Sequence, residues 1–164
     1  MTRICFLMLL IFSVPTLSSA SSDIPVGCVG KSNVTEDAYR SWAQVPKEIT
    51  ASDKISPNPQ VEIGIRSAIK LKKSQNETRG FVHFQLQDGG DYFVISDFYP
   101  RMNILDTENK NASLEASAWG PIRECDTMKK SLRFQLKPKQ KYILEVLSRD
   151  SDTVNVLIVK APAQ

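Results

Sequence analysis

The chain has 164 residues and a mass of 18.4 kDa, which is enough for one domain with a core of ordinary size. Hydrophobic residues make up 41% and charged residues 24%, so the composition excludes a disordered chain and a membrane protein with several spans. The formal net charge of +3 is small and the lysines stand in short turn-like groups, so no nucleic-acid partner is expected.

The first twenty residues have the three parts of a signal peptide. Arg3 supplies a positive start, residues 4–14 form a short apolar run, and residues 18–20 (Ser-Ser-Ala) form a small-residue cleavage site. The apolar run is shorter than the roughly 18 residues that a spanning helix needs, and no second such run follows. We therefore expect cleavage after Ala20 and a periplasmic or secreted mature chain without a transmembrane segment. A retained membrane anchor is the alternative.

Three cysteines are present, and Cys5 leaves with the signal peptide. Cys28 and Cys125 remain as an even pair in an oxidising compartment, which predicts a disulfide. It would span 97 residues and contribute about 4 to 5 kcal/mol in the chain-entropy model. Two free thiols or a metal pair are the alternatives. Zinc needs about four ligands, and the mature chain has two Cys and one His, so no metal site is predicted.

Residues 21–60 form an N-terminal arm with little β character. A short helix is expected to start at residues 35–37 (Thr-Glu-Asp), because a capping hydroxyl followed by acids suits the positive end of a helix. The helix must end before Pro46. Trp42 is expected to anchor the helix on a sheet, with a ligand contact as the alternative. Residues 52–60, with two prolines, are interpreted as a linker loop.

From residue 61 the hydrophobic period changes to two, which predicts a β-domain over residues 61–164. Residues 61–71 are expected to form one long, half-buried strand. Residues 81–86 and 92–96 are expected to pair as a hairpin, because an Asp-Gly-Gly-Asp turn separates them.

The later part of the chain repeats this pattern. Residues 102–105 indicate a weaker strand, and residues 132–136 and 142–146 alternate on either side of a Lys-Pro-Lys-Gln turn. The last strand, residues 154–159, is expected to form a second hairpin with the strand before it. The irregular stretch at residues 109–127 is longer than a usual connection, so a site is expected there if the chain has one.

These elements predict a mainly β fold. Six or more short strands with turn signals between them and no alternating helices favour an antiparallel β-sandwich of the jelly-roll type with a short N-terminal helix. The expected organisation is a signal peptide at 1–20, an arm at 21–60 and a sandwich domain at 61–164.

Short motifs follow one another in a characteristic order. A cysteine, a Trp-bearing helix and an alternating strand come first, and glycine, cysteine and proline motifs follow. They are Cys28, Trp42, residues 61–71, Gly80-Phe81, Gly90-Asp91-Tyr92, Gly120-Pro121 with Cys125 and Lys129-Lys130, Phe134-Gln135-Leu136, and Lys137-Pro138. Over most of the mature chain this order resembles a family of small exported bacterial β-sandwich proteins of unassigned function. The later half is similar to the pre-peptidase C-terminal type of β-sandwich, an accessory module of secreted enzymes.

The chain also departs from that family. Relatives, some of them labelled homogentisate dioxygenases, carry histidines just before the Gly-Pro, where this chain has Ser117 and Trp119. The spacing from Pro121 to Cys125 is longer, and the turn after Pro138 lacks its glycine. Dioxygenase iron is held by two histidines and a carboxylate, which a mature chain with one histidine does not supply. No cofactor is therefore predicted.

His83 and two carboxylate pairs are the candidates for acid-base chemistry. His83 is the only imidazole, and alternation places it on the face opposite Val82 and Phe84. We expect a surface or loop-covered histidine, with a catalytic one as the alternative, because no nucleophile motif stands near a strand end. Asp88 with Asp91 and Asp150 with Asp152 are expected to be turn residues. The alternative for these pairs is a weak calcium site.

The best candidate for ligand contact is the segment from Trp119 to Arg123. Trp119 could stack on a sugar or peptide, and Arg123 could hydrogen-bond to it, beside a constrained Gly-Pro bend. The alternative is a loop pinned to the sandwich by Cys125, because exposed aromatic residues often cover the edge of a core.

Three Asn-x-Ser/Thr sequences begin at Asn33, Asn76 and Asn111. They are glycosylation acceptors only in a eukaryotic source. Because the resemblance points to bacteria, we interpret them as polar loop residues.

Together these features predict function only broadly. We expect an exported, non-enzymatic β-sandwich that acts as a binding or accessory module for a carbohydrate, a peptide or an envelope partner. A small secreted hydrolase or metal-dependent enzyme is the alternative, and its mechanism would have to use His83 or a carboxylate pair.

Overall fold

One helix and eleven strands make up the regular structure in the computed structural model, which describes residue 28, residues 34–74 and residues 77–162. The predicted signal peptide at 1–20 lies outside the described residues. The helix is α1 (Glu36–Ala43), and the strands are β1 (Lys47–Thr50), β2 (Ser67–Lys70), β3 (Lys72–Ser74), β4 (Glu77–Gln85), β5 (Gly90–Ser96), β6 (Arg101–Asp106), β7 (Ala112–Leu114), β8 (Ala118–Pro121), β9 (Lys130–Leu136), β10 (Lys141–Ser148) and β11 (Thr153–Lys160). The predicted mainly β fold with one short helix is confirmed.

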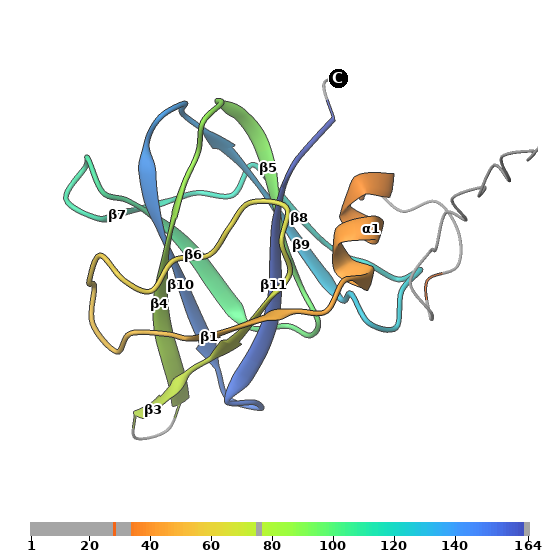
Figure 1. Cartoon of the computed structure of the whole chain (residues 1–164), viewed down its shortest axis with the longest axis horizontal. Coiled ribbons are helices and arrows are strands. Elements are labelled where there is room, and N and C mark those ends of the chain that lie inside the picture. Colours follow the sequence, from red (N-terminus) through yellow and green to blue (C-terminus); the bar gives the residue numbers. More distant parts are fainter. Residues whose placement is uncertain (1–27, 29–33, 75–76, 163–164) are drawn as a thin grey trace, which may run out of the picture.

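The strands form two sheets packed face to face (Figure 1). One has six strands in the order β1-β2-β11-β5-β9-β8, and the other has five in the order β3-β4-β10-β6-β7. Neighbouring strands are antiparallel except β1 and β2. In the five-stranded sheet, Leu144 of β10 lies opposite Val82 of β4 and Ile104 of β6. The predicted sandwich is confirmed.

The core lies between the two sheets because alternate side chains of each strand turn inward. Val94 and Ile158 of the six-stranded sheet and Phe84 and Leu144 of the five-stranded sheet are buried in it. The ring of Phe84 stacks on that of Tyr142, with centroids 5.5 Å apart. Burial of each such side chain contributes roughly 1.5 to 3 kcal/mol.

The outer face of the six-stranded sheet is covered by α1 and by the loop at residues 122–128 (Figure 1). Trp42 is 1% exposed and belongs to a cluster that contains Ile95 and Leu157 of the sheet, which confirms its predicted role as the anchor of the helix. Cys28 and Cys125 lie at disulfide distance, so the predicted pairing links the arm to this loop. The middle of this outer face, over β5 and β11, is therefore covered.

Both predicted hairpins are wrong. β4 belongs to the five-stranded sheet and β5 to the six-stranded sheet, so the Asp-Gly-Gly-Asp turn carries the chain from one sheet to the other. The same holds for β10 and β11, on either side of residues 149–152. Alternation fixes which side chains turn inward but not which strand lies alongside, so a short turn between alternating strands fits both connections.

The long strand expected at residues 61–71 is also wrong. Only Ser67–Lys70 is a strand, because Gly64 adopts a φ of +79° and its N–H donates to the carbonyl of Ile158. Val61 and Leu71 are nevertheless buried in the core, whereas Ile65 is exposed. Strand β1 was not predicted. The stretch expected to be irregular contains the short edge strands β7 and β8.

Candidate functional site

The outer face of the five-stranded sheet is covered by no helix of the described part of the chain. We call it the β10 face. Its side chains form three rows across β4, β10 and β6: Arg79, Leu147 and Arg101; Phe81, Glu145 and Asn103; and His83, Ile143 and Leu105. Each row has an apolar or aromatic member beside polar ones. The face thus combines a buried apolar layer with charged groups above it.

An ion pair between the buried Glu145 and the partly exposed Arg79 fixes the middle of the β10 face. Glu145 is buried, and one of its oxygens accepts from Nε of Arg79 at 2.8 Å and from a terminal nitrogen of the same guanidinium. Its other oxygen accepts from Nδ2 of Asn103 at 2.7 Å. The Arg79 guanidinium also lies over the ring of Phe81, 4.8 Å from its centroid. Because both charges are satisfied within the protein, this pair is structural.

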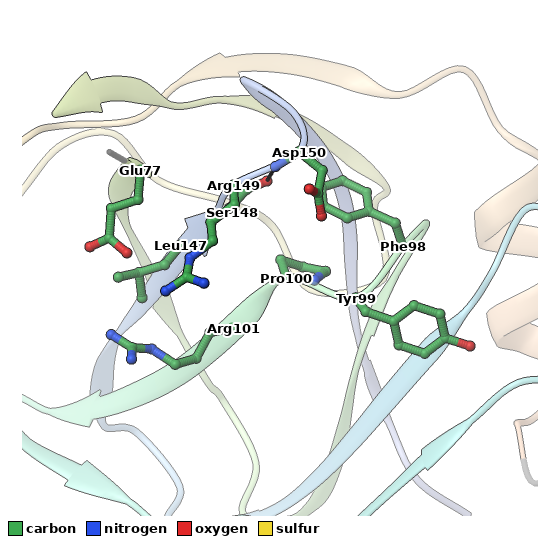
Figure 2. A pocket seen from close by; sticks show the side chains of 9 residues that line it. All are labelled: Glu77, Phe98, Tyr99, Pro100, Arg101, Leu147, Ser148, Arg149 and Asp150. Carbon is green, nitrogen blue, oxygen red and sulfur yellow. Dashed lines mark hydrogen bonds between the residues drawn. The ribbon is translucent and has the colours of Figure 1, made fainter. Parts of the chain in front are cut away.

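A recess of about 260 Å³ lies at one end of the β10 face (Figure 2). We call it the arginine recess. It is lined by Glu77, Phe98, Tyr99, Pro100, Arg101, Leu147, Ser148, Arg149 and Asp150. These residues come from the start of β4, the loop between β5 and β6, and the end of β10 with the loop after it.

Charged groups gather on one side of this recess. Figure 2 shows the guanidinium groups of Arg101 and Arg149 and the carboxylate of Glu77 around Leu147, with Tyr99 pointing away. Leu147 is 4% exposed, whereas both arginines are exposed. Neither arginine has an ion-pair partner among residues 28, 34–74 and 77–162. Two cationic forks therefore stand free over an apolar floor.

Hydrogen bonds hold the loop that carries Arg149. The Thr78 hydroxyl donates to the carbonyl of Ser148 or that of Ser151, with its oxygen 3.0 and 2.9 Å from them. The Ser148 hydroxyl oxygen accepts from the backbone N–H groups of Asp150 and Ser151 at 3.2 and 3.1 Å. The loop is therefore positioned before any ligand arrives.

The opposite wall, residues 98–101, is held in a similar way. Nζ of Lys130 donates to the carbonyl of Pro100 at 2.7 Å, and the Ser96 hydroxyl donates to that of Phe98 at 2.9 Å. Burial lowers the pKa of Lys130. This ammonium group supports the backbone of the recess from behind.

A second recess, of about 320 Å³, lies at the other end of the β10 face. We call it the histidine recess. It is lined by Ile55, Ser56, Pro57, Gln60, His83, Phe84, Gln85, Thr107, Asn111, Lys141 and Ile143. The loop at residues 55–57 forms one wall, and residues on either side of it bridge to β4 at Phe81 and His83.

His83 lies on the outer side of β4, as predicted, and is half-buried. Its Nε2 atom is buried and has no hydrogen-bond partner among the described residues. Burial lowers the pKa of His83 most, and the positive charge of Lys141 lowers it further, while a hydrogen bond with the backbone of Ser56 opposes them. The lining of this recess contains no Asp, Glu or Cys. Acid-base chemistry there would have to use His83 or Lys141 without a carboxylate in the lining.

Trp119 and Arg123, the candidates from the sequence, lie elsewhere. Trp119 is on the edge strand β8 of the six-stranded sheet and is 72% exposed, and Arg123 is exposed in the turn after it. Neither lines the arginine recess or the histidine recess. Their role in ligand contact stays a prediction.

The predicted carboxylate pairs are divided between different contacts. Asp91 pairs with Arg133 at 2.5 Å and Asp88 with Lys160 at 3.7 Å. Asp150 lines the arginine recess, whereas Asp152 does not. Among the residues that the structure describes, no three His, Cys, Asp or Glu side chains gather as they would around a metal ion.

The arginine recess was missed from the sequence because its lining comes from three separate segments. From the sequence, Asp150 was considered only together with Asp152 in a turn, and Arg101 and Arg149 were assigned no role. Their proximity depends on β6 and β10 being neighbours, which alternation does not predict.

Comparison with known proteins adds no relative: the chain matches no protein-family model and no curated protein. The family resemblance drawn from its motifs therefore stays a prediction. In the described part of the chain, no helix combines the length and the apolar character needed to cross a lipid bilayer.

Proposed function

We propose that the mature chain is an exported, non-enzymatic module that binds a carbohydrate on its β10 face. The observation that carries this proposal is the arginine recess, where Arg101 and Arg149 stand without carboxylate partners among the described residues. Pinned loops form both walls, so little ordering is needed on binding. α1 covers the middle of the opposite outer face, whereas no helix of the described residues covers the β10 face.

The chemistry of the recess favours a sugar over an apolar ligand. Arg101 and Arg149 offer donors, Glu77 and Asp150 offer acceptors, and Leu147 offers a small apolar surface. Sugar rings present hydroxyl groups around their rim and C–H groups on their faces, so they match such a mixture. A purely apolar ligand would leave the charged groups desolvated and unpaired.

Export remains part of the proposal. The signal-peptide pattern at residues 1–20 supports it, and so does the placement of Cys28 and Cys125 at disulfide distance, because disulfides persist in oxidising compartments. The expected location is the periplasm or the extracellular medium.

A hydrolase is the second candidate, and His83 carries it. An enzyme that used the histidine recess would lose its activity in His83→Ala, whereas carbohydrate binding at the arginine recess would persist in that variant. The two functions are thus separable by one substitution.

The test is binding of the mature chain, residues 21–164, to an array of neutral and acidic glycans. We expect the wild-type protein to bind, the Arg101→Gln/Arg149→Gln variant to lose at least about 10-fold in affinity, and Trp119→Ala to bind normally. Absence of binding by folded wild-type protein would contradict the proposal. Loss of binding in Trp119→Ala alone would move the site to β8.

A further inference from the structure

We infer that the arginine recess recognises the carboxylate of an acidic sugar, a uronate residue within a glycan. This inference rests on the proposed function and adds the ligand's chemical class. Three steps lead to it: the unpaired charges, the polarity and size of the recess, and the placement of its acidic groups.

Two of the three arginines around Leu147 lack a carboxylate partner in the described residues. Three arginines surround Leu147, and Arg79 is already occupied by Glu145 and by the ring of Phe81. Arg101 on β6 and Arg149 on the loop after β10 have no such partner in the described residues, and their guanidinium groups point to the same side of the recess (Figure 2). A guanidinium group presents parallel N–H donors that match the two oxygens of a carboxylate. Two guanidinium groups on the same side of the recess therefore indicate a planar anionic ligand group.

The volume of the arginine recess limits the size of its ligand. Pockets for drug-sized ligands typically enclose about 300 to 1,000 Å³, so a recess of about 260 Å³ admits a smaller group. One sugar residue has this scale. The recess opens on the β10 face, so the rest of a chain can continue over the surface. Leu147 and Pro100 provide apolar contact for a ring face.

The acidic residues of the recess restrict the charge of its ligand. Glu77 and Asp150 line the same recess, so its charges balance: two positive and two negative. Carboxylates accept hydrogen bonds from sugar hydroxyls but repel a dense polyanion. A uronate, with one charge on each sugar residue and several hydroxyl groups, satisfies both kinds of side chain. A nucleic acid or a heavily sulfated glycan would place extra negative charge beside Glu77 and Asp150.

The test compares trigalacturonate with its methyl ester, which keeps the sugar rings and removes the charge. Isothermal titration of the mature chain should give about 10-fold or tighter binding of the acid than of the ester. Arg101→Gln and Arg149→Gln should each remove most of that difference. Arg40→Gln removes the same charge from an exposed position on α1, away from the recess, and should leave the difference unchanged. Thermal unfolding of each variant checks that it is folded.

Other outcomes separate this inference from the proposed function. Equal affinity for acid and ester, or binding of neutral glycans only, would overturn the uronate inference while carbohydrate binding stands. Failure of every glycan on the array would overturn both. Tighter binding of a peptide with a free C-terminal carboxylate than of trigalacturonate would assign the arginines to a peptide ligand and contradict the inference.

Discussion

Arg79, Arg101 and Arg149 stand around the same buried leucine, but only Arg79 has a carboxylate partner in the described part of the chain. The side chains are chemically identical, so their surroundings decide their roles. Arg79 is paired with Glu145, whereas Arg101 and Arg149 are available to a ligand. The sequence does not contain this distinction, because Arg79 and Glu145 are separated by 66 positions.

The stability of the fold should depend on pH through His83. Burial lowers its pKa below the ordinary 6.5, so the unfolded chain binds a proton more readily than the folded chain. The contribution of His83 to stability is therefore complete above about pH 6.5 and is lost as the pH falls through the lowered folded pKa. We expect urea unfolding of the wild-type mature chain to show a larger loss of stability between about pH 7.5 and 5.5 than the His83→Gln variant.

The wild type and the His83→Gln variant share every other titrating group, so a difference in the pH dependence of their stability comes from His83. A His83→Gln variant with the same pH dependence as the wild type would show that the histidine has the same proton affinity in both states.

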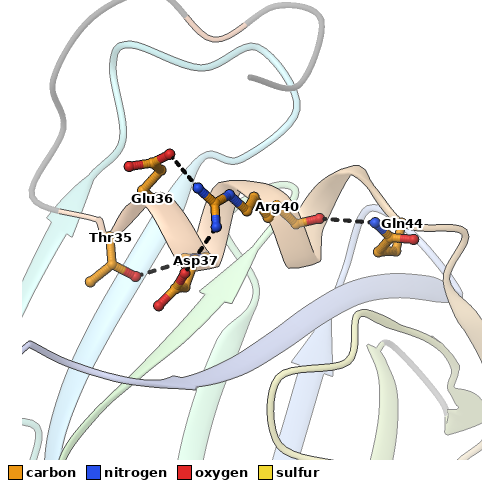
Figure 3. A network of polar contacts seen from close by, with 6 residues as sticks. Thr35, Glu36, Asp37, Arg40 and Gln44 are labelled. Carbon is orange, nitrogen blue, oxygen red and sulfur yellow. Dashed lines mark hydrogen bonds and ion pairs between the residues drawn. The ribbon is translucent and has the colours of Figure 1, made fainter. Parts of the chain in front are cut away.

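At the level of elements, local signals predicted α1 well. The Thr35 hydroxyl accepts from the backbone N–H of Ala38 at 3.2 Å, and Arg40 pairs with Glu36 at 2.7 Å (Figure 3). These contacts span three or four residues, so a single window of sequence contains both partners. The failed hairpins differ because strand pairing in this fold joins segments far apart in the chain, such as β10 with β4.

Gly80 of β4 lies close to Ala51, the residue directly after β1. A Cβ atom at Gly80 would lie 2.9 Å from Cδ2 of Leu71 and closer still to Cβ of Ala51, so the neighbouring backbone would have to move. We expect Gly80→Ala to lower the free energy of unfolding by about 1 to 3 kcal/mol, as overpacking of a core does. Chemical denaturation measures this change.

Gly120 is the matched control, because a Cβ atom there would meet nothing within 4 Å. Gly120→Ala should change stability by no more than about 0.5 kcal/mol. Equal effects of the two substitutions would mean that β1 does not pack against β4 as described.

At the scale of the whole molecule, the sandwich was predictable and the difference between its two outer faces was not. The period of two from residue 61 onward, with turn signals between the short strands, was enough to predict the sandwich. Which outer face the arm covers depends on long-range packing of Trp42 against Ile95 and Leu157. That packing leaves the β10 face as the one without a helix in the described residues, and the pairing of β6 with β10 places the arginine recess on it.

The most direct measurement is a map of backbone amide chemical shifts in the ¹⁵N-labelled mature chain during titration with trigalacturonate. We expect the largest changes at Glu77, Arg101 and residues 147–150, with the region of α1 unchanged. Changes centred on residues 119–123, or no change anywhere in the folded protein, would contradict recognition of the glycan on the β10 face.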